Sequence, residues 1–274
     1  MAKQAPRKPA QPRIRLAKQN NYREKAPATG DTAPTEGMRL NKYVAHCGIC
    51  SRRQAADLVK GGQVSVNGAV IVEPFYQMKP GDVVRYKGKV IRPEEHKVYL
   101  LMNKPKGVIS TSQDERGRTT VMDLIKDKVK ERVFPVGRLD RDTTGLLLLT
   151  NDGELAMKMT HPSFKMEKQY DVELNKELKP EDLQKIREGL VLEDGPATVD
   201  AAHYTPGKGK NAATLLLHVG RNRIVRRIFE QLGYEVVKLD RVYLGGLTKK
   251  DLPRGFVRYL TPREVIMLKH FSGK

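Results

Sequence analysis

The longest apolar run in this chain is only strand-sized, and this length limits the folds that are open to it. Residues 145–150 read GLLLLT, and no run in the 274 residues approaches the roughly 20 apolar residues that a membrane-spanning helix needs. The apolar content still suffices to bury a core, so we expect a soluble protein with one ordinary domain and one small domain.

The charge of the chain points to a polyanionic partner. Its formal net charge is +19 and its pI is about 9.9. Each phosphate that such a surface neutralises releases condensed counterions, which favours binding. Nucleic acid is therefore the leading partner. An anionic membrane is the competing one, although no segment is long enough to enter it as a helix.

Residues 1–37 combine Lys, Arg, Pro, Gln and Ala with almost no large apolar side chains. Such a segment cannot bury enough surface to offset its chain entropy, so we predict a disordered basic arm that either solubilises the protein or contacts RNA phosphates loosely. The arm lacks the apolar segment of a secretory signal, and we expect a cytoplasmic protein. An organellar transit peptide is the alternative, but the prolines disfavour its amphipathic helix.

Cys47 and Cys50 form a lone C-x-x-C next to His46. Structural zinc needs four ligands, and there is no second pair of cysteines. A redox motif should open a helix after a strand, which this one does not. We therefore interpret both cysteines as reduced thiols in a tight turn between two helices and expect no metal.

The segment 38–90 predicts a helix-turn-helix followed by a small sheet. Apolar residues at helical spacing from Met38 end at Gly48, and Ser51 with Gln54 forms a capping box that opens a second helix. Alternating valines around Asn67-Gly68 then predict a hairpin, and a second turn precedes a strand near residue 84.

This segment resembles the RNA-binding domain that ribosomal small-subunit protein four shares with tyrosyl-tRNA synthetase. The resemblance is carried by MRLNKYVAHCGICSRRQAADLVKGGQVSVNGAVI at residues 38–71. It implies that Arg39, Lys42, Arg52 and Arg53, on the exposed face of the two helices, lie against folded RNA. A solvated charged face is the alternative interpretation.

Residues 91–97 (IRPEEHK) are polar and predict a linker into a larger domain at 98–274. There, strands expected near 98–102, 133–136, 146–150, 170–174 and 215–219 are mixed with helices expected at 179–190 and 222–232. This mixture predicts an α+β domain with a mostly antiparallel sheet.

A charged loop bracketed by glycines, residues 137–145 (GRLDRDTTG), lies between two of the apolar strands. Rigid strands would present such a loop firmly, and loops on rigid scaffolds often carry function. Its composition alone does not separate a functional loop from a solvated connection.

Residues 137–156, GRLDRDTTGLLLLTNDGELA, resemble the signature of the pseudouridine synthases that act on ribosomal RNA and carry a small RNA-binding domain ahead of the catalytic one. NKPKGVIST at 103–111, EKQYDVEL at 167–174 and GRNRIVRRIFEQLG at 220–233 extend the match, which covers nearly everything after residue 37. The resemblance makes Asp140 the catalytic aspartate. It implies isomerisation of a uridine in ribosomal RNA.

Making pseudouridine breaks the bond between ribose and uracil nitrogen, turns the base, and joins its carbon 5 to the same ribose carbon. One ionised carboxylate can act on the sugar as nucleophile or as base, and the sequence does not distinguish the two. By resemblance, Tyr170 stacks on the uracil and helps to remove the proton from carbon 5.

The helix at 222–232 carries arginines opposite its apolar face. By resemblance, Arg226 pairs with Asp140 and Val225 packs under the target base, while Arg223 and Arg227 meet phosphates. The resemblance also assigns Arg138 and Lys168 to substrate binding.

No dinucleotide fingerprint, phosphate-binding glycine loop or metal-ligand cluster is present in the sequence, so we expect no cofactor. The expected partner is ribosomal RNA or a precursor of a ribosomal subunit, bound by a monomer. Details of the resemblance favour the large-subunit branch of the family. The main alternative is a non-catalytic ribosome-assembly factor. A tRNA-linked ligase or synthetase that shares only the small domain is disfavoured, because no nucleotide-binding signature follows residue 90.

Overall fold

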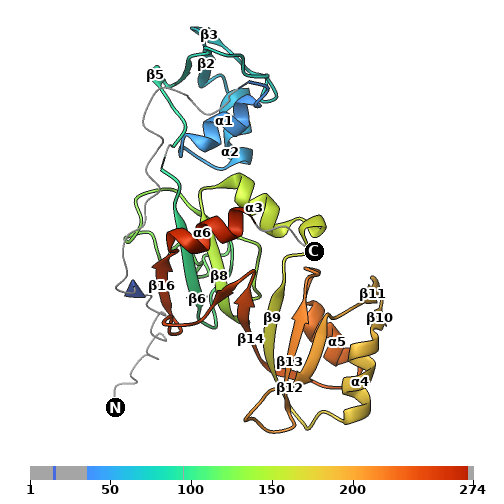
Figure 1. Cartoon of the computed structure of the whole chain (residues 1–274). Coiled ribbons are helices and arrows are strands. Elements are labelled where there is room, and N and C mark those ends of the chain that lie inside the picture. Colours follow the sequence, from blue (N-terminus) through green and yellow to red (C-terminus); the bar gives the residue numbers. More distant parts are fainter. Residues whose placement is uncertain (1–14, 17–35, 95, 271–274) are drawn as a thin grey trace, which may run out of the picture. The chain divides into compact units, whose positions relative to one another are not determined.

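The computed structural model describes residues 15–16, 36–94 and 96–270. These residues fall into two compact units (Figure 1). The first, called here the small unit, comprises the described residues within 23–97. The second, called the large unit, comprises those within 1–22 and 98–274.

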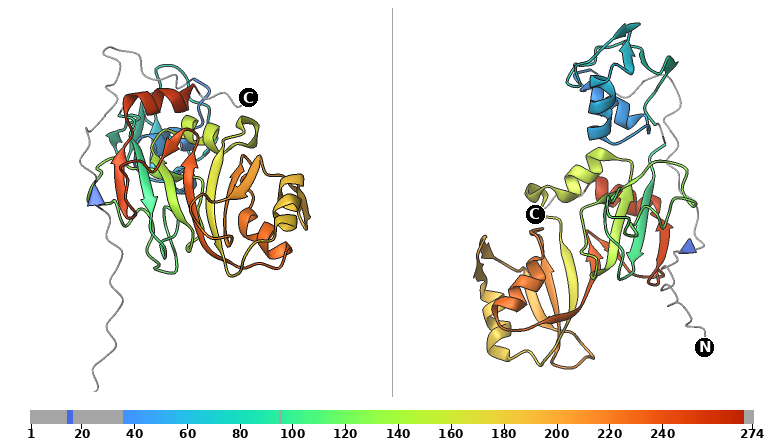
Figure 2. Two further views of the ribbon diagram at one scale, coloured as in Figure 1. Left: turned by 60° about the horizontal axis from the view of Figure 1, so that its bottom comes forward. Right: turned by 180° about the vertical axis from the view of Figure 1, so that it is seen from behind.

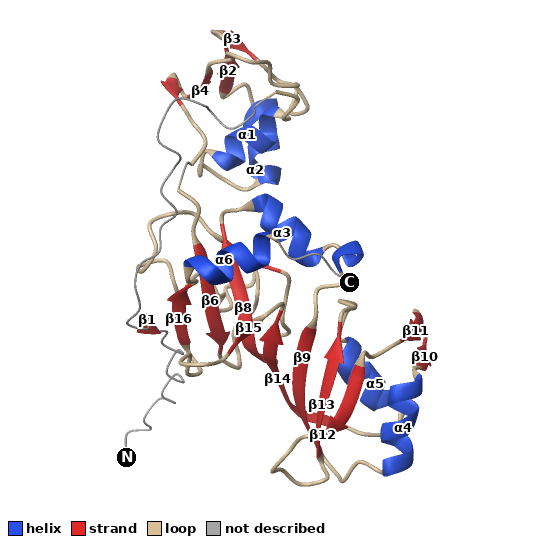
Figure 3. Ribbon diagram, viewed as in Figure 1, coloured by secondary structure: helices blue, strands red, loops and turns tan. Residues whose placement is uncertain are grey.

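The small unit contains two helices and a four-stranded antiparallel sheet with the order β3-β2-β4-β5 (Figure 3). Its elements are α1 (Leu40–His46), α2 (Arg52–Lys60), β2 (Val64–Val66), β3 (Ala69–Val70), β4 (Val84–Tyr86) and β5 (Lys89–Val90). Ser51 caps α2, and Gln54 completes the capping box. Buried side chains from both helices and two strands, among them Leu40, Val59 and Val84, form its core.

The polar segment before the large unit is not a free hinge along its whole length. Tyr43 Oη donates to the carbonyl of Ile91 at 3.3 Å, and the amide of Glu94 donates to the carbonyl of His46 at 2.8 Å. The first half of the predicted linker therefore packs on the small unit.

The basic arm is described only in part, because residues 1–14 and 17–35 lie outside the described residues. Arg15–Leu16 form strand β1, which runs parallel to β16 (Phe256–Tyr259), and the amide of Arg15 donates to the carbonyl of Gly255 at 3.0 Å. The expectation of disorder over the whole arm is wrong at these two residues, since main-chain pairing needs no apolar side chain.

The large unit is built on one sheet with the order β1-β16-β6-β8-β14-β9-β13-β12, to which β7 and β15 are added. Among the described strands only β1 with β16 and β8 with β14 pair in parallel, so the predicted mostly antiparallel α+β fold is confirmed. Its remaining strands are β6 (Tyr99–Lys104), β7 (Phe134–Val136), β8 (Thr144–Thr150), β9 (Lys168–Leu174), β12 (Ala201–Tyr204), β13 (Ala212–Leu217), β14 (Val236–Leu244) and β15 (Leu247–Thr248).

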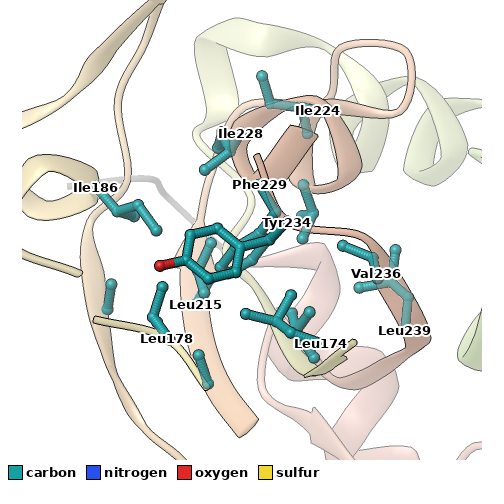
Figure 4. Close-up of a cluster of buried hydrophobic side chains, with 14 of the residues drawn as sticks. Leu174, Leu178, Ile186, Leu215, Ile224, Ile228, Phe229, Tyr234, Val236 and Leu239 are labelled. Atoms are coloured by element: carbon teal, nitrogen blue, oxygen red, sulfur yellow. The ribbon is translucent and has the colours of Figure 1, made fainter. Parts of the chain in front are cut away.

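Helices cover the two halves of this sheet separately (Figure 2). α3 (Gly153–Thr160) and α6 (Pro262–Lys269) pack on β6 and β8, whereas α4 (Pro180–Glu188) and α5 (Ile224–Gln231) pack on β9, β12 and β13. β6 and β8 are buried on both faces because the segment after β6 covers the side opposite α3 and α6. Figure 4 shows the core of the other half around Phe229 and Leu215.

The two halves meet where β8 lies beside β14, a contact called here the β8–β14 junction. Thr144 pairs with Asp240 and Gly145 with Arg241. Side chains reinforce these two residue pairs: Thr144 Oγ1 donates to Asp240 Oδ1 at 2.7 Å, and Arg241 Nε donates to the carbonyl of Leu146 at 2.7 Å. Gly145 has φ +113°, and a Cβ there would lie 2.3 Å from the carbonyl oxygen of Arg241. Only glycine fits this position.

We expect Gly145→Ala to destabilise the large unit by about 3 kcal/mol or more, because backbone overlap adds to the strain of the positive φ. Gly207→Ala is the matched control, since Gly207 also has a positive φ (+72°) but nothing lies within 4 Å of the added Cβ. Thermal unfolding of both variants against the parent protein measures the difference. Equal losses in the two variants would contradict the close approach at the junction.

Candidate active site

The loop between β7 and β8 is held in place by the segment that follows β6. Ser110 Oγ donates to the carbonyl of Leu139 at 3.0 Å and accepts from its amide at 3.2 Å. The amide of Gly107 donates to the carbonyl of Arg141 at 2.8 Å. Asp140 therefore sits on a loop fixed on both sides, with its side chain 36% exposed.

Lys104, at the end of β6, supports the same loop from inside the protein. Its side chain is fully buried, and Nζ donates to the carbonyls of Val108 (2.6 Å), Pro105 (3.1 Å) and Arg141 (3.3 Å). Burial is the main reason that the pKa of Lys104 is lowered to about 8; the charges of Asp142 and Asp140 oppose this shift and that of Arg241 adds to it. Sequence reasoning missed Lys104, although it lies in the quoted NKPKG segment.

Arg226, on α5, approaches Asp140 from the other half of the sheet. Its Nε lies 4.0 Å from Asp140 Oδ2, and Nη1 donates to the carbonyl of Val236 at 2.8 Å. Arg226 is only 9% exposed, and within the described part of the chain its Nε makes no hydrogen bond. The polar side of α5 is therefore not wholly solvated. The arginine predicted to pair with Asp140 lies beside it.

Tyr170 and Val225 come from the half of the sheet that α5 covers. Tyr170 lies at the centre of β9, opposite Leu215 on one neighbouring strand and Arg241 on the other, and its side chain is half-buried. Val225 is 3% exposed and belongs to the buried hydrophobic cluster of this half of the sheet.

A cavity of ≈ 430 Å³ lies next to the Asp140 loop. Gly137 and Arg138 of that loop line it, together with Tyr170 and with Ile224 at the start of α5, whereas Asp140 itself is not among the lining residues. The other charged or titratable lining residues are His161, Lys165, Lys168, His218, Arg221 and Arg241. Five lysines and arginines and no carboxylate face this space, so its chemistry favours an anion.

Two of these cations are poorly solvated. Lys168 Nζ donates to the carbonyls of Met166 (2.7 Å) and His218 (2.9 Å), and burial together with the charge of Arg241 lowers its pKa to about 8. Arg241 is 3% exposed, and its Nη2 finds no hydrogen-bond partner within the described residues. Sequence reasoning missed Arg241, which sits mid-strand on β14.

The remaining arginines around α5 are engaged by groups of the protein itself. Arg227 pairs with Asp194 at 2.8 Å, and Arg223 pairs with Glu230 at 3.3 Å. Arg221 Nη1 donates to the carbonyl and carboxylate of Asp194, next to the hairpin of β10 (Leu190–Leu192) and β11 (Gly195–Ala197). Both terminal nitrogens of Arg227 contact Asp194, whereas Arg223 contacts Glu230 through Nη2 alone.

On the small unit, the basic residues predicted to face RNA lie on the two helices and at their starts. Arg39, Arg52 and Arg53 are exposed and Lys42 is half-exposed. None of the four makes an ion pair within the described residues. The nearby Cys47 lies in the turn between α1 and α2, and burial raises its pKa to about 12, so the thiol is protonated and is a poor metal ligand.

Among residues 15–16, 36–94 and 96–270, no group of three or more His, Cys, Asp or Glu side chains could hold a metal ion. No helix in the same ranges is long and apolar enough to cross a membrane.

Comparison with known proteins matches both units. The family model described as RNA pseudouridylate synthase matches residues 98–231, and the model of the S4 domain matches residues 38–84. A crystal structure of a pseudouridylate synthase superposes with a TM-score of 0.59 and 28% identity, covering 84% of this chain and 99% of that one.

Sequence relatives extend over nearly the same length. The ribosomal large subunit pseudouridine synthase B of Bacillus subtilis is 43% identical over 234 residues, which are 84% of this chain and 95% of that protein. The dual-specificity RNA pseudouridine synthase RluF of Escherichia coli is 37% identical over 86% of this chain and 79% of that protein. With both units matched in the same order along the chain, this protein belongs to the RNA pseudouridylate synthase family and carries an S4 domain ahead of its catalytic domain.

Proposed function

We propose that the protein converts a uridine of ribosomal RNA, in the large subunit, into pseudouridine, with Asp140 as the essential carboxylate. The observation that carries the proposal is the Asp140 carboxylate on a fixed loop, 4.0 Å from the buried Arg226 and next to a basic cavity. The similarity to the large-subunit enzyme of Bacillus subtilis supports the choice of subunit.

Asp140 and Arg226 form a pair of opposite charges at the site. The Arg226 guanidinium is largely buried and lies 4.0 Å from the partly exposed Asp140 carboxylate, so the two groups attract each other. An ionised carboxylate can attack ribose carbon 1 as uracil leaves, or remove a sugar proton as the glycosidic bond breaks. Both routes begin from the same state of Asp140. The base then turns and its carbon 5 bonds to ribose carbon 1.

Tyr170 and the basic cavity have complementary tasks in this scheme. Tyr170 presents an aromatic ring beside the cavity, which suits stacking on uracil and acceptance of the carbon 5 proton, directly or through water. Val225, which is 3% exposed, belongs to the hydrophobic cluster against which Tyr170 packs. Arg138, Lys168 and Arg241 face the cavity without a carboxylate among the lining residues, which suits the phosphodiester of an extruded nucleotide.

The two units have different proposed roles, RNA binding and catalysis. We propose that residues 38–90 hold RNA through Arg39, Lys42, Arg52 and Arg53 and that residues 98–274 perform the chemistry. The isomerisation neither oxidises nor hydrolyses its substrate, so we propose that it runs without a cofactor. We also propose that the protein acts as a monomer in the cytoplasm, where the RNA of ribosomes under assembly is found in bacteria.

Asp140→Asn should abolish turnover and leave RNA binding within a factor of about 3, because the amide keeps the size of the side chain but cannot act as nucleophile or base. Release of label from carbon 5 of uridine in unmodified large-subunit RNA measures turnover. Asp142→Asn, two residues along the same loop, is the matched control and should remain active. Turnover by Asp140→Asn would disprove the assigned role. Tight binding without release by the parent protein would indicate an assembly factor.

Replacing Arg52 and Arg53 together with Ala should weaken RNA binding and flatten its salt dependence. Both side chains are exposed, and each phosphate contact contributes about 0.7–0.9 to the slope of log K against log salt. Affinities measured at several salt concentrations give that slope. The exposed Lys126→Ala on the large unit controls for the loss of a charge away from the proposed surface. An unchanged slope in the double variant would remove these arginines from the interface.

RNA affinity should fall by about tenfold as the pH rises from 7 to 9, since one charge-assisted contact is lost when Lys168 deprotonates. Its pKa of about 8 lies below the usual 10.5, so the charged form prevails below pH 8 and is lost above it. Lys168→Arg should make the decline shallower because a guanidinium stays protonated. The exposed Lys165→Arg should leave the decline as it is. Identical pH profiles for all three proteins would contradict this account.

A further inference from the structure

The small unit displays an aromatic ring that its core does not use. Phe75 lies between β3 and β4, and its side chain is 59% exposed. Its neighbours point inward: Pro74 and Met78 are buried, and Tyr76 packs against the core. Burying an aromatic side chain stabilises a fold, so leaving this one in solvent forgoes stabilisation that the adjacent residues obtain.

The segment that carries Phe75 is fixed to the start of α1. The amide of Leu40 donates to the carbonyl of Tyr76 at 2.9 Å, and the amide of Asn41 donates to that of Pro74 at 3.1 Å. Arg39 forms a β-bridge with Gln77. Tyr76 Oη also donates to Asp82 at 3.2 Å. The ring is therefore presented outward by a braced backbone, so little ordering entropy is lost when a ligand meets it.

A positive charge lies over the ring. The guanidinium carbon of Arg39 lies 5.1 Å from the centroid of the Phe75 ring, a cation–π contact. Lys42 follows on α1, whose first turn contains no acidic residue. Arg39 lies over the ring, and 59% of the surface of Phe75 is still exposed to solvent. An aromatic face beside phosphate-binding charges is the arrangement that holds unpaired bases in single-stranded RNA.

We propose that Phe75 is a stacking site for one unpaired base of the RNA substrate, with Arg39 neutralising an adjacent phosphate. The inference rests on the proposed function only in taking RNA as the partner. It adds a contact to a base, where the basic residues of the two helices supply contacts to the backbone. Since every base has a π-face, the site tolerates sequence but requires a flipped-out or looped nucleotide.

Fluorescence tests this directly, because the chain contains no tryptophan. Phe75→Trp places a single reporter in the site, and stacking on a base should quench its emission as a large-subunit RNA fragment with an unpaired loop is added to the full-length protein. Val90→Trp is the matched control: Val90 is 47% exposed on β5, at the edge of the four-stranded sheet opposite β3, and its emission should change little. Absence of quenching in Phe75→Trp at saturating RNA would overturn the proposal.

The affinity for RNA provides a second test of the stacking site. Phe75→Leu keeps an apolar side chain but removes the ring, and should weaken binding of the same RNA by roughly 5–150-fold with an unchanged salt slope. Phe75→Trp should restore the affinity, and Arg39→Ala should reduce the salt slope. Parental affinity in Phe75→Leu would refute the site, and a concurrent loss of self-association in that variant would assign Phe75 to contact with a second copy of the chain.

The two proposals fail separately. Label release from carbon 5 reports on Asp140 and the large unit, whereas tryptophan quenching reports on the small unit whether or not turnover occurs. Unaltered thermal unfolding of Phe75→Leu checks that any loss of affinity comes from the surface, as its exposure leads us to expect.

Discussion

The pairing of β8 with β14 is the interaction on which the rest of the large unit depends. The Asp140 loop precedes β8, whereas Arg226 and Tyr170 belong to the half of the sheet that α5 covers. Two parallel residue pairs join these halves, and the approach at Gly145 is closer than any side chain would allow. The strand that follows Asp140 is thus joined by a contact between main chains to the half of the sheet that carries Arg226.

The sequence predicted the regular elements well and the irregular ones poorly. Apolar alternation or helical spacing indicated β9, α4 and α5, and the residue types of the capping box indicated the start of α2. β14 was missed because register shifts near Val236 and Arg241 interrupt its alternation. α6 was also missed, although Thr261 and Glu264 form a capping box with Pro262 in the first turn, a signal that could have been found.

The site was predictable only where a motif identified it. Asp140, Arg226 and Tyr170 followed from resemblance, and the structure places Arg226 4.0 Å from Asp140 and Tyr170 in the wall of the neighbouring cavity. Lys104 and Arg241 were missed because a lysine or arginine is expected at the surface, and no local pattern distinguishes a cation buried among carbonyl groups. Likewise, Arg223 pairs with Glu230 and Arg227 pairs with Asp194. The helical spacing of the arginines in the sequence does not predict these ion pairs.

The hydrogen bonds that hold the Asp140 loop determine whether the protein or the RNA has to change conformation when the two bind. Ser110, Gly107 and Lys104 hold this loop through hydrogen bonds to its main chain, so the carboxylate has little freedom to reach toward a buried sugar. In the proposed reaction, the target nucleotide has to unstack and move to the loop, so the RNA undergoes the larger conformational change. In the proposed reaction, an RNA segment that unstacks at a lower free-energy cost therefore reaches the Asp140 loop more readily. Uridines that unstack easily would then be modified faster than tightly stacked uridines with the same neighbouring sequence.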